Sequence, residues 1–161
     1  MFKSFRTSLS FIFIALFAIP TQAAADTFKI FETKYTQIHY LQDEDMQQFL
    51  WRIGGKRIDV YTYPGFAKSR VDRIVEKVQS LLDMYPEDFK IAVYLRPQYE
   101  KGHIAFYRNE NQSVVVYADR VTDNVFAHEI SHAVINSYFE SPPSSKVKEI
   151  LSQYVDVHLW E

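Results

Sequence analysis

Cysteine is absent from the 161 residues, which excludes disulfide bonds and a lipid-modified cysteine near the N-terminus. A domain without disulfides has to be stabilised by its hydrophobic core or by a bound metal. Clusters of lysine and arginine are also missing, which argues against nucleic acid or anionic lipid as the main partner. Internal repeats, low-complexity tracts and linkers are missing as well, so the sequence predicts one domain.

A long apolar run lies near the N-terminus, but it is too short to cross a membrane. It covers residues 11–19, whereas a helix needs about 20 apolar residues to cross ~30 Å of hydrocarbon. Two basic residues precede the run, Pro20 follows it, and residues 23–25 are alanines, which a signal peptidase accepts. This order is typical of a secretory signal peptide over residues 1–25, and it predicts an exported protein, either periplasmic or secreted.

Cleavage before Asp26 would leave 136 residues, the size of one domain that can bury a core. The leader contains Lys3 and Arg6 but no acid, so residues 26–161 hold 16 basic and 20 acidic residues, a formal charge of −4. Aromatic residues make up 16% of the sequence, which suits strands and a groove rather than a disordered tail. We expect one folded domain over residues 26–161 that has no membrane contact once the leader is removed.

Hydrophobic periodicity and turn residues predict a mixture of helices and strands. The expected elements are a strand at 36–41, a helix at 43–53, a short strand at 58–63, a helix with a capping box at Ser69 and Asp72 that runs to 82, a strand at 91–95, a hairpin of strands at 103–107 and 113–117, a helix at 123–138, and a helix at 145–159. Helices and strands are mixed first, and a hairpin and two helices follow. This order predicts an α+β fold.

Residues 128–132 read HEISH within an otherwise apolar helical segment. Residues four apart lie on one face of a helix, about 6 Å apart along its axis, so His128 and His132 can direct imidazole nitrogens at one zinc ion. Glu129 is rotated by one residue and would lie beside the open coordination position. There a carboxylate can take a proton from water and pass it to a leaving amine. Polar side chains on such an apolar helix are unfavourable unless they are satisfied, and this favours a metal site.

A third ligand is expected from the helix that follows the prolines at 142–143. Three downstream acids are candidates. Glu140 lies at the end of the first helix, about 12 Å along the axis from His132, and Asp156 lies two turns beyond Glu149 with a shorter side chain. Glu149 lies one turn into a helix that can fold back beside the first. It is therefore the expected third ligand.

HEISH followed by a glutamate on the next helix resembles the gluzincin branch of zinc metallopeptidases. Residues 149–154, EILSQY, are similar to the E-G-L-A-x-Y stretch of exported peptidase-MA-like proteins and to the E-x-x-S-D stretch of thermolysin-like enzymes. The resemblance covers residues 103–156. It implies a zincin-like fold, in which a mixed sheet with an edge-strand hairpin is followed by an active-site helix and a glutamate-bearing helix. It also implies Zn²⁺ as the cofactor, bound by His128, His132 and Glu149.

The hairpin adds a second match to the thermolysin-like family. Residues 105–107, the polar turn and residues 115–119 resemble the edge strand and the following strand of that family. The resemblance implies that Ala105, Phe106 and Tyr107 hold an extended peptide through backbone hydrogen bonds. It also implies a positioning role for Gln153, which stands where the family has an aspartate that orients a ligand histidine.

Larger members of the family stabilise the oxyanion with a tyrosine or histidine from a second subdomain. Tyr138, Tyr154 and His158 are the residues that could substitute here, although packing or surface roles are more usual for such side chains on a helix. His39 and His103 are likewise expected to be structural.

The residues alone leave three interpretations open. The first is a small exported zinc metallopeptidase that acts on a peptide or protein, with Glu129 as general base. The second is a zinc-stabilised binding module, such as a periplasmic chaperone, inhibitor or regulator, that has lost turnover. The third is a chance match without metal. Glu129 favours the enzyme, because a purely structural site does not need that carboxylate and usually fills all four positions with protein ligands.

Overall fold

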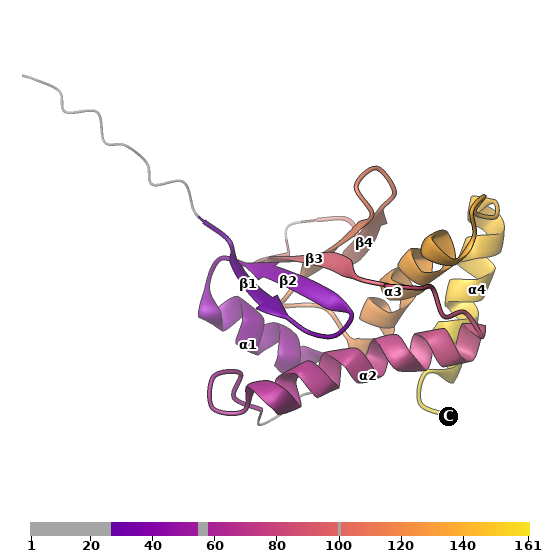
Figure 1. Ribbon diagram of the computed structural model, residues 1–161. Helices are drawn as coiled ribbons and strands as arrows, with labels where there is room; N and C mark the ends of the chain where they lie inside the picture. The colour runs from indigo at the N-terminus through magenta and orange to yellow at the C-terminus, as the bar shows by residue number, and fades with distance from the viewer. Residues whose placement is uncertain (1–26, 55–57, 100) are drawn as a thin grey trace, which may run out of the picture.

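One mixed sheet of five strands forms the centre of the fold, and four helices pack beside it (Figure 1). The computed structural model describes residues 27–54, 58–99 and 101–161. Within these ranges the elements are β1 (Lys29–Glu32), β2 (Thr36–Tyr40), α1 (Asp43–Arg52), α2 (Pro64–Leu82), β3 (Ile91–Arg96), β4 (Ala105–Arg108), β5 (Ser113–Tyr117), α3 (Asp123–Tyr138) and α4 (Ser145–His158). The expected signal peptide at residues 1–25 lies outside the described residues. Among the described helices, none has both the length and the apolar character needed to cross a membrane.

The strands are ordered β1-β2-β3-β5-β4, and the two outer strands run antiparallel to the three inner ones. The α+β class and the β4–β5 hairpin are therefore confirmed. β4 pairs with β5 along one side only, and α3 packs against it. An open backbone edge thus lies next to the helix that carries HEISH.

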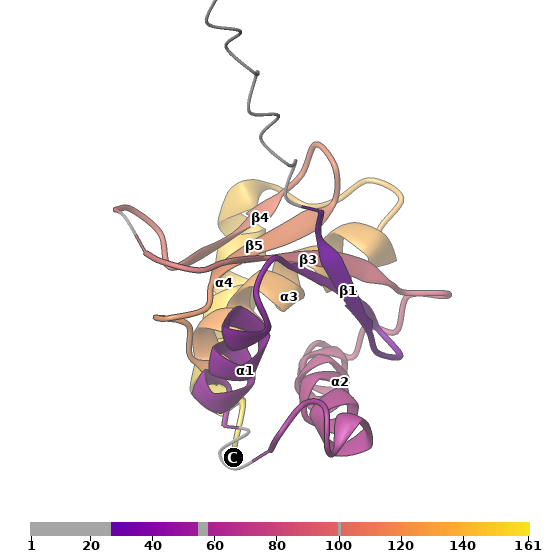
Figure 2. The same ribbon diagram turned by 90° about the vertical axis from the view of Figure 1, so that its left-hand side faces the viewer.

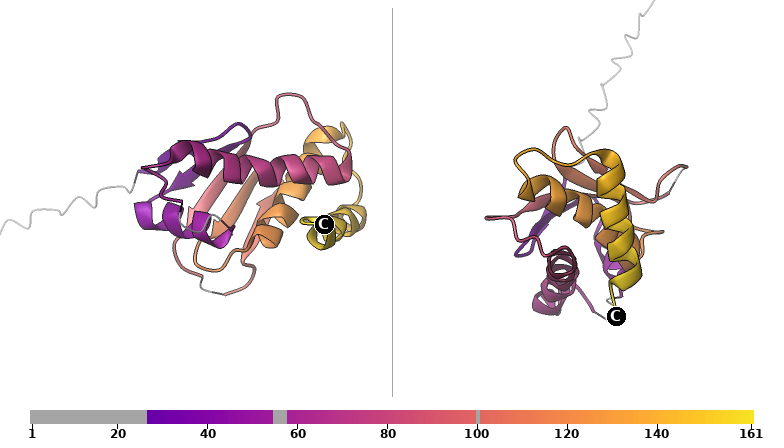
Figure 3. Two further views of the ribbon diagram at one scale, coloured as in Figure 1. Left: turned by 90° about the horizontal axis from the view of Figure 1, so that it is seen from below. Right: turned by 90° about the vertical axis from the view of Figure 1, so that its right-hand side faces the viewer.

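Helices α1, α2 and α3 lie on one face of the sheet, as Figure 2 and the left view of Figure 3 show. Alternate residues of β2 and β3 are buried toward them, and Ile38 and Val93 are completely buried. On the opposite face, the rings of Phe28, His39 and Tyr94 pack together, and His39 stacks on Tyr94 with ring centroids 4.7 Å apart. His39 therefore has a packing role.

The strand predicted at residues 58–63 is wrong, because this segment forms a turn that leads into α2. The Asp59 carboxylate accepts hydrogen bonds from the backbone N–H groups of Tyr61 and Thr62, at 2.9 and 2.6 Å. This side-chain-to-backbone pattern stabilises a turn in preference to a strand. The aromatic residues that suggested a strand, Tyr61 and Tyr63, are exposed.

Helix α2 begins at Pro64, well before the capping box predicted at Ser69 and Asp72. Proline suits the first helical position, because its missing N–H would have no partner there. The Asp72 carboxylate accepts backbone N–H groups of Lys34 and Tyr35, at 3.2 and 3.3 Å, in the turn between β1 and β2. Asp72 therefore connects α2 to the sheet and does not cap its own helix.

Helix α4 packs along α3, and this contact positions the site (Figure 3, right view). Ser131 and Ser152 are buried, and their hydroxyls are hydrogen-bonded to each other across the two helices. Small side chains at this point let the helix backbones approach closely. Asn124 Nδ2 also donates to the carbonyl oxygen of Asp156, at 2.8 Å. Val155 of α4 and Leu159, which follows the last residue of the helix, are buried in the core.

Candidate metal centre

Helix α3 begins and ends where the sequence predicted, at Asp123 and Tyr138. Thr122 is the N-cap, and its hydroxyl accepts a hydrogen bond from the backbone N–H of Val125 at 3.3 Å. One side of the helix is buried in the core, including Phe126 and Ile130. The opposite side carries the polar residues of HEISH toward a cleft.

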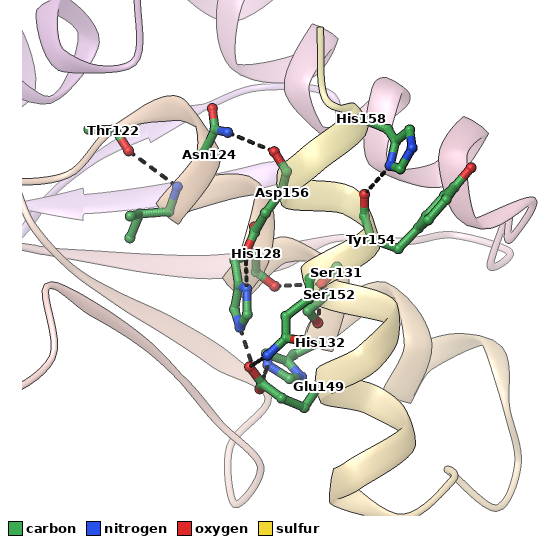
Figure 4. Close-up of polar contacts among 12 residues, drawn as sticks. Thr122, Asn124, His128, Ser131, His132, Glu149, Ser152, Tyr154, Asp156 and His158 are labelled. Atoms are coloured by element: carbon green, nitrogen blue, oxygen red, sulfur yellow. Dashed lines mark hydrogen bonds and ion pairs between the residues drawn. The ribbon is translucent and has the colours of Figure 1, made fainter. Parts of the chain in front are cut away.

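Two imidazoles and one carboxylate converge from α3 and α4 (Figure 4). Glu149 Oε2 lies 3.6 Å from His128 Nε2 and 3.7 Å from His132 Nε2. One ligand atom from each of the three residues lies within 4.8 Å of the others. Neighbouring ligand atoms of a tetrahedral zinc site are roughly 3.3 Å apart, given Zn–N bonds of about 2.0–2.1 Å. The three expected ligands therefore lie together, and their spacing fits a metal ion.

The donor set leaves one side of the cluster open. The side chains of His128 and His132 are 19% and 17% exposed, whereas that of Glu149 is 48% exposed. Protein supplies three ligands, and the fourth direction faces the cleft. Three protein ligands with an open position are typical of catalytic zinc sites, while structural sites close all four positions.

Asp156 orients one of the histidines. Its Oδ2 lies 2.9 Å from His128 Nδ1 (Figure 4). A carboxylate at this position favours the tautomer in which Nδ1 carries and donates the proton, and this tautomer leaves the Nε2 lone pair free to bind a metal. The sequence placed this role on Gln153. The structure corrects this, because Gln153 Nε2 donates to Glu149 Oε1 at 3.2 Å. Gln153 thus holds the carboxylate ligand, and the aspartate one turn later holds the imidazole.

Replacing Asp156 by asparagine should weaken zinc binding by about 10–100-fold, because the uncharged amide polarises His128 less strongly. The measurement is zinc affinity by competition with a chromophoric chelator. Glu140→Gln is the matched control, since Glu140 is exposed at the end of α3 and should leave the affinity unchanged. Equal affinities of the Asp156 variant and the wild type would remove Asp156 from the site.

Glu129 lies beside the cluster, and β4 holds it in place. Its Oε2 accepts a hydrogen bond from the backbone N–H of Tyr107 at 2.7 Å. Burial raises the pKa of Glu129 above the usual carboxyl value, while the charge of His128 and the Tyr107 N–H act in the opposite direction. A raised pKa brings a carboxylate closer to the range in which it can both take up and release a proton near neutral pH.

His132 is kept in the form that binds metals. Burial, followed by the charge of His128, lowers its pKa to about 4, and Glu149 opposes this shift. The ring of Tyr107 stacks on the His132 ring, with centroids 6.4 Å apart. His132 is therefore neutral at pH 7, as metal ligation requires.

Two hollows meet beside His128 and Glu129 and form one cleft between β4 and the helices α3 and α4. The first has a volume of about 430 Å³ and the second about 390 Å³. Both are in the size range of small-molecule and peptide-side-chain sites. The residues that line both hollows are His103, Ala105, His128 and Glu129. Glu129 thus lies in the middle of the cleft, where both halves can present a substrate to it.

The register of β4 decides which of its backbone groups face the cleft. Tyr117 N donates to Ile104 O at 3.0 Å, and backbone groups alternate in direction along a strand. Phe106 therefore pairs with β5, and its backbone is not free for a substrate. Ala105 and Tyr107 direct their backbone groups toward the cleft, and the Tyr107 N–H there donates a hydrogen bond to the Glu129 carboxylate. Of the three predicted substrate contacts, Ala105 and Tyr107 have the required backbone orientation, and Phe106 does not.

The cleft also contains Lys148, which the sequence analysis did not consider, and His103, which it expected to be structural. Lys148 lines the second hollow, and His103 lines both. The two tyrosines and the histidine considered for the oxyanion lie elsewhere: Tyr154 stacks with His158 at 4.2 Å between ring centroids, and Tyr138 packs on Phe139. His103 lines the cleft because the segment that leads into β4 lies beside α3, and no local pattern in the sequence reveals that pairing.

Comparisons with protein-family models, with curated proteins and with solved structures find no match to this chain. A functional conclusion therefore depends on the geometry of the cleft. The geometry combines three side chains that could hold a metal ion, an open fourth side, a half-buried carboxylate and a strand edge.

Proposed function

We propose that this chain is a small exported zinc metallopeptidase of the gluzincin type. The observation that carries the proposal is the position of Glu129 next to the open side of the His128, His132 and Glu149 cluster. A structural metal site has no need for a second carboxylate held at its open side. The β4 edge beside the cleft supplies the surface on which a peptide can lie.

The nitrogen and oxygen donors suit zinc. Two imidazoles and one carboxylate are the ligand set of several zinc hydrolases, and the chain has no cysteine to supply the thiolates that iron–sulfur clusters require. A zincin-like arrangement is supported by the antiparallel edge strand β4, followed by α3 and then by α4 with the third ligand.

Zinc, when bound, would lower the pKa of a coordinated water and polarise the scissile carbonyl. Glu129 takes the proton from the attacking water and passes it to the departing amine. The Tyr107 N–H fixes the orientation of that carboxylate, and Asp156 fixes the orientation of His128. The backbone of Ala105, on the cleft side of β4, holds the peptide extended across the site.

A zinc-stabilised binding module is the second candidate. It is favoured by the positions of Tyr138, Tyr154 and His158, which do not line the cleft and so supply no donor for the oxyanion. Incubation of zinc-loaded protein with a broad peptide library at neutral pH separates the candidates. Cleavage products support the peptidase, and intact peptides that remain bound support the module.

Zinc should stabilise the fold in either case, because it joins α3 to α4. Zinc at 100 times its dissociation constant adds about 2.7 kcal/mol to the free energy of unfolding, which corresponds to a rise in melting temperature of roughly 10 °C for a domain of this size. Calorimetry of metal-free and zinc-loaded protein measures the shift. His132→Ala is the control and should not respond to zinc. Identical melting curves for the wild type would refute the expected coupling.

A further inference from the structure

The two halves of the cleft differ in charge. Apart from the residues that line both hollows, the first hollow has one charged side chain, Asp156, and this acid is hydrogen-bonded to His128. The second hollow has two, Glu149 and Lys148. The Glu149 carboxylate faces the two imidazoles. Lys148 is therefore the one lysine or arginine among the residues that line the cleft, and it lines the second hollow but not the first.

Lys148 has no acidic partner within 4 Å among residues 27–54, 58–99 and 101–161. Its ammonium group donates to Asn136 Oδ1 at 3.2 Å, and Asn136 Nδ2 donates in turn to Asn109 Oδ1 at 2.9 Å. This chain of amides joins α4, α3 and the turn after β4. It positions the ammonium group in the cleft wall without neutralising its charge.

The surroundings of Lys148 suit an anionic group on the ligand. The residue is half-buried, and the hydrogen bond to Asn136 Oδ1 holds its ammonium group in place. A cation in a partly desolvated wall gains more from a carboxylate than an exposed lysine does, because solvent screens the pair less. Lys146, two residues earlier on α4, is fully on the surface and does not line the cleft.

We propose that Lys148 binds a carboxylate of the substrate, so that the enzyme selects peptides with an acidic group on the side of the scissile bond that occupies the second hollow. This selectivity rests on the proposed peptidase function. The carboxylate has two possible sources, the side chain of Asp or Glu and the carboxyl end of the peptide. A charge-assisted hydrogen bond of this kind should favour the acid over its neutral isostere by roughly 10-fold or more.

A binding measurement tests the proposal independently of turnover. Zinc-loaded Glu129→Gln protein is titrated into fluorescent peptides in which one glutamate is moved along a fixed neutral sequence, and each peptide is paired with its glutamine counterpart. A second pair differs only in a free or an amidated carboxyl end. We expect the acidic peptide to bind about 10-fold more tightly than its neutral counterpart in one of the two series. A preference at one position of the glutamate series identifies a side-chain carboxylate, and a preference in the second pair identifies the carboxyl end of the peptide.

Two further variants are made in the same Glu129→Gln background. Lys148→Met should abolish the preference for the acidic peptide over the neutral one, and Lys146→Met should retain it. Zinc content of both variants confirms that the site is intact. Equal affinity for every acidic and neutral pair, or a preference that survives Lys148→Met, overturns the proposal. Failure of wild-type protein to cleave the tightest-binding peptide would instead contradict the peptidase function and leave the carboxylate site standing.

Discussion

Glu129→Gln is expected to reduce peptide cleavage by about 10²–10⁴-fold, the typical contribution of a general base, while zinc content stays at the wild-type level. Glutamine has nearly the same shape, and its carbonyl oxygen can still accept the hydrogen bond from the Tyr107 N–H. It cannot accept a proton from water near neutral pH. The measurement is kcat/KM for a peptide cleaved by the wild type, together with zinc content and melting temperature.

Glu110→Gln is the matched control for this substitution. Glu110 is exposed in the turn between β4 and β5 and does not line either hollow. It should leave cleavage unchanged. If Glu129→Gln retained wild-type cleavage with one zinc bound, another group would have to be the base, and the proposed mechanism would be wrong.

Glu149→Ala should weaken zinc binding by more than the roughly 10–100-fold expected for Asp156→Asn, because it removes a ligand and not a group that orients one. Glu149 is half exposed, and its hydrogen bond in the described structure comes from Gln153. The fold should therefore survive the change, which near-unchanged far-ultraviolet circular dichroism would verify. Zinc affinity is measured by chelator competition.

Glu140→Ala is the control for the third ligand. Glu140 was a rival ligand from sequence spacing, and the structure places it exposed beyond the end of α3. Its removal should leave the affinity unchanged. Wild-type affinity in Glu149→Ala, or a strong loss in Glu140→Ala, would contradict the assignment of the third ligand.

Helix α3 was predictable because its signals are local. Apolar residues recur in it at helical spacing, and prolines at residues 142–143 follow its end. The order of the strands was not predictable, because it depends on pairing between distant segments. β1 was missed for another reason. It is an edge strand with three exposed residues of four, so its sequence shows no alternation between a buried and an exposed face.

The grouping of His128, His132 and Glu149 was predictable because the spacing of HEISH places two imidazoles on one helix face, and the turn at residues 142–143 returns the chain to that face. The contact between Asp156 and His128 was not. Whether Gln153 or Asp156 meets an imidazole depends on the rotation and height of α4 against α3, which the buried Ser131–Ser152 contact sets. The unpaired charge of Lys148 is likewise visible only once Asn136 and Asn109 are placed beside it.

The central claim is that His128, His132 and Glu149 bind one zinc ion. The most direct measurement is zinc stoichiometry by equilibrium dialysis of metal-free protein produced without a metal-binding tag, with His128→Ala dialysed beside it. The claim predicts one zinc per wild-type chain and a loss of tight binding in the variant. Wild-type protein without stoichiometric zinc, or His128→Ala that binds zinc as tightly as the wild type, would contradict it.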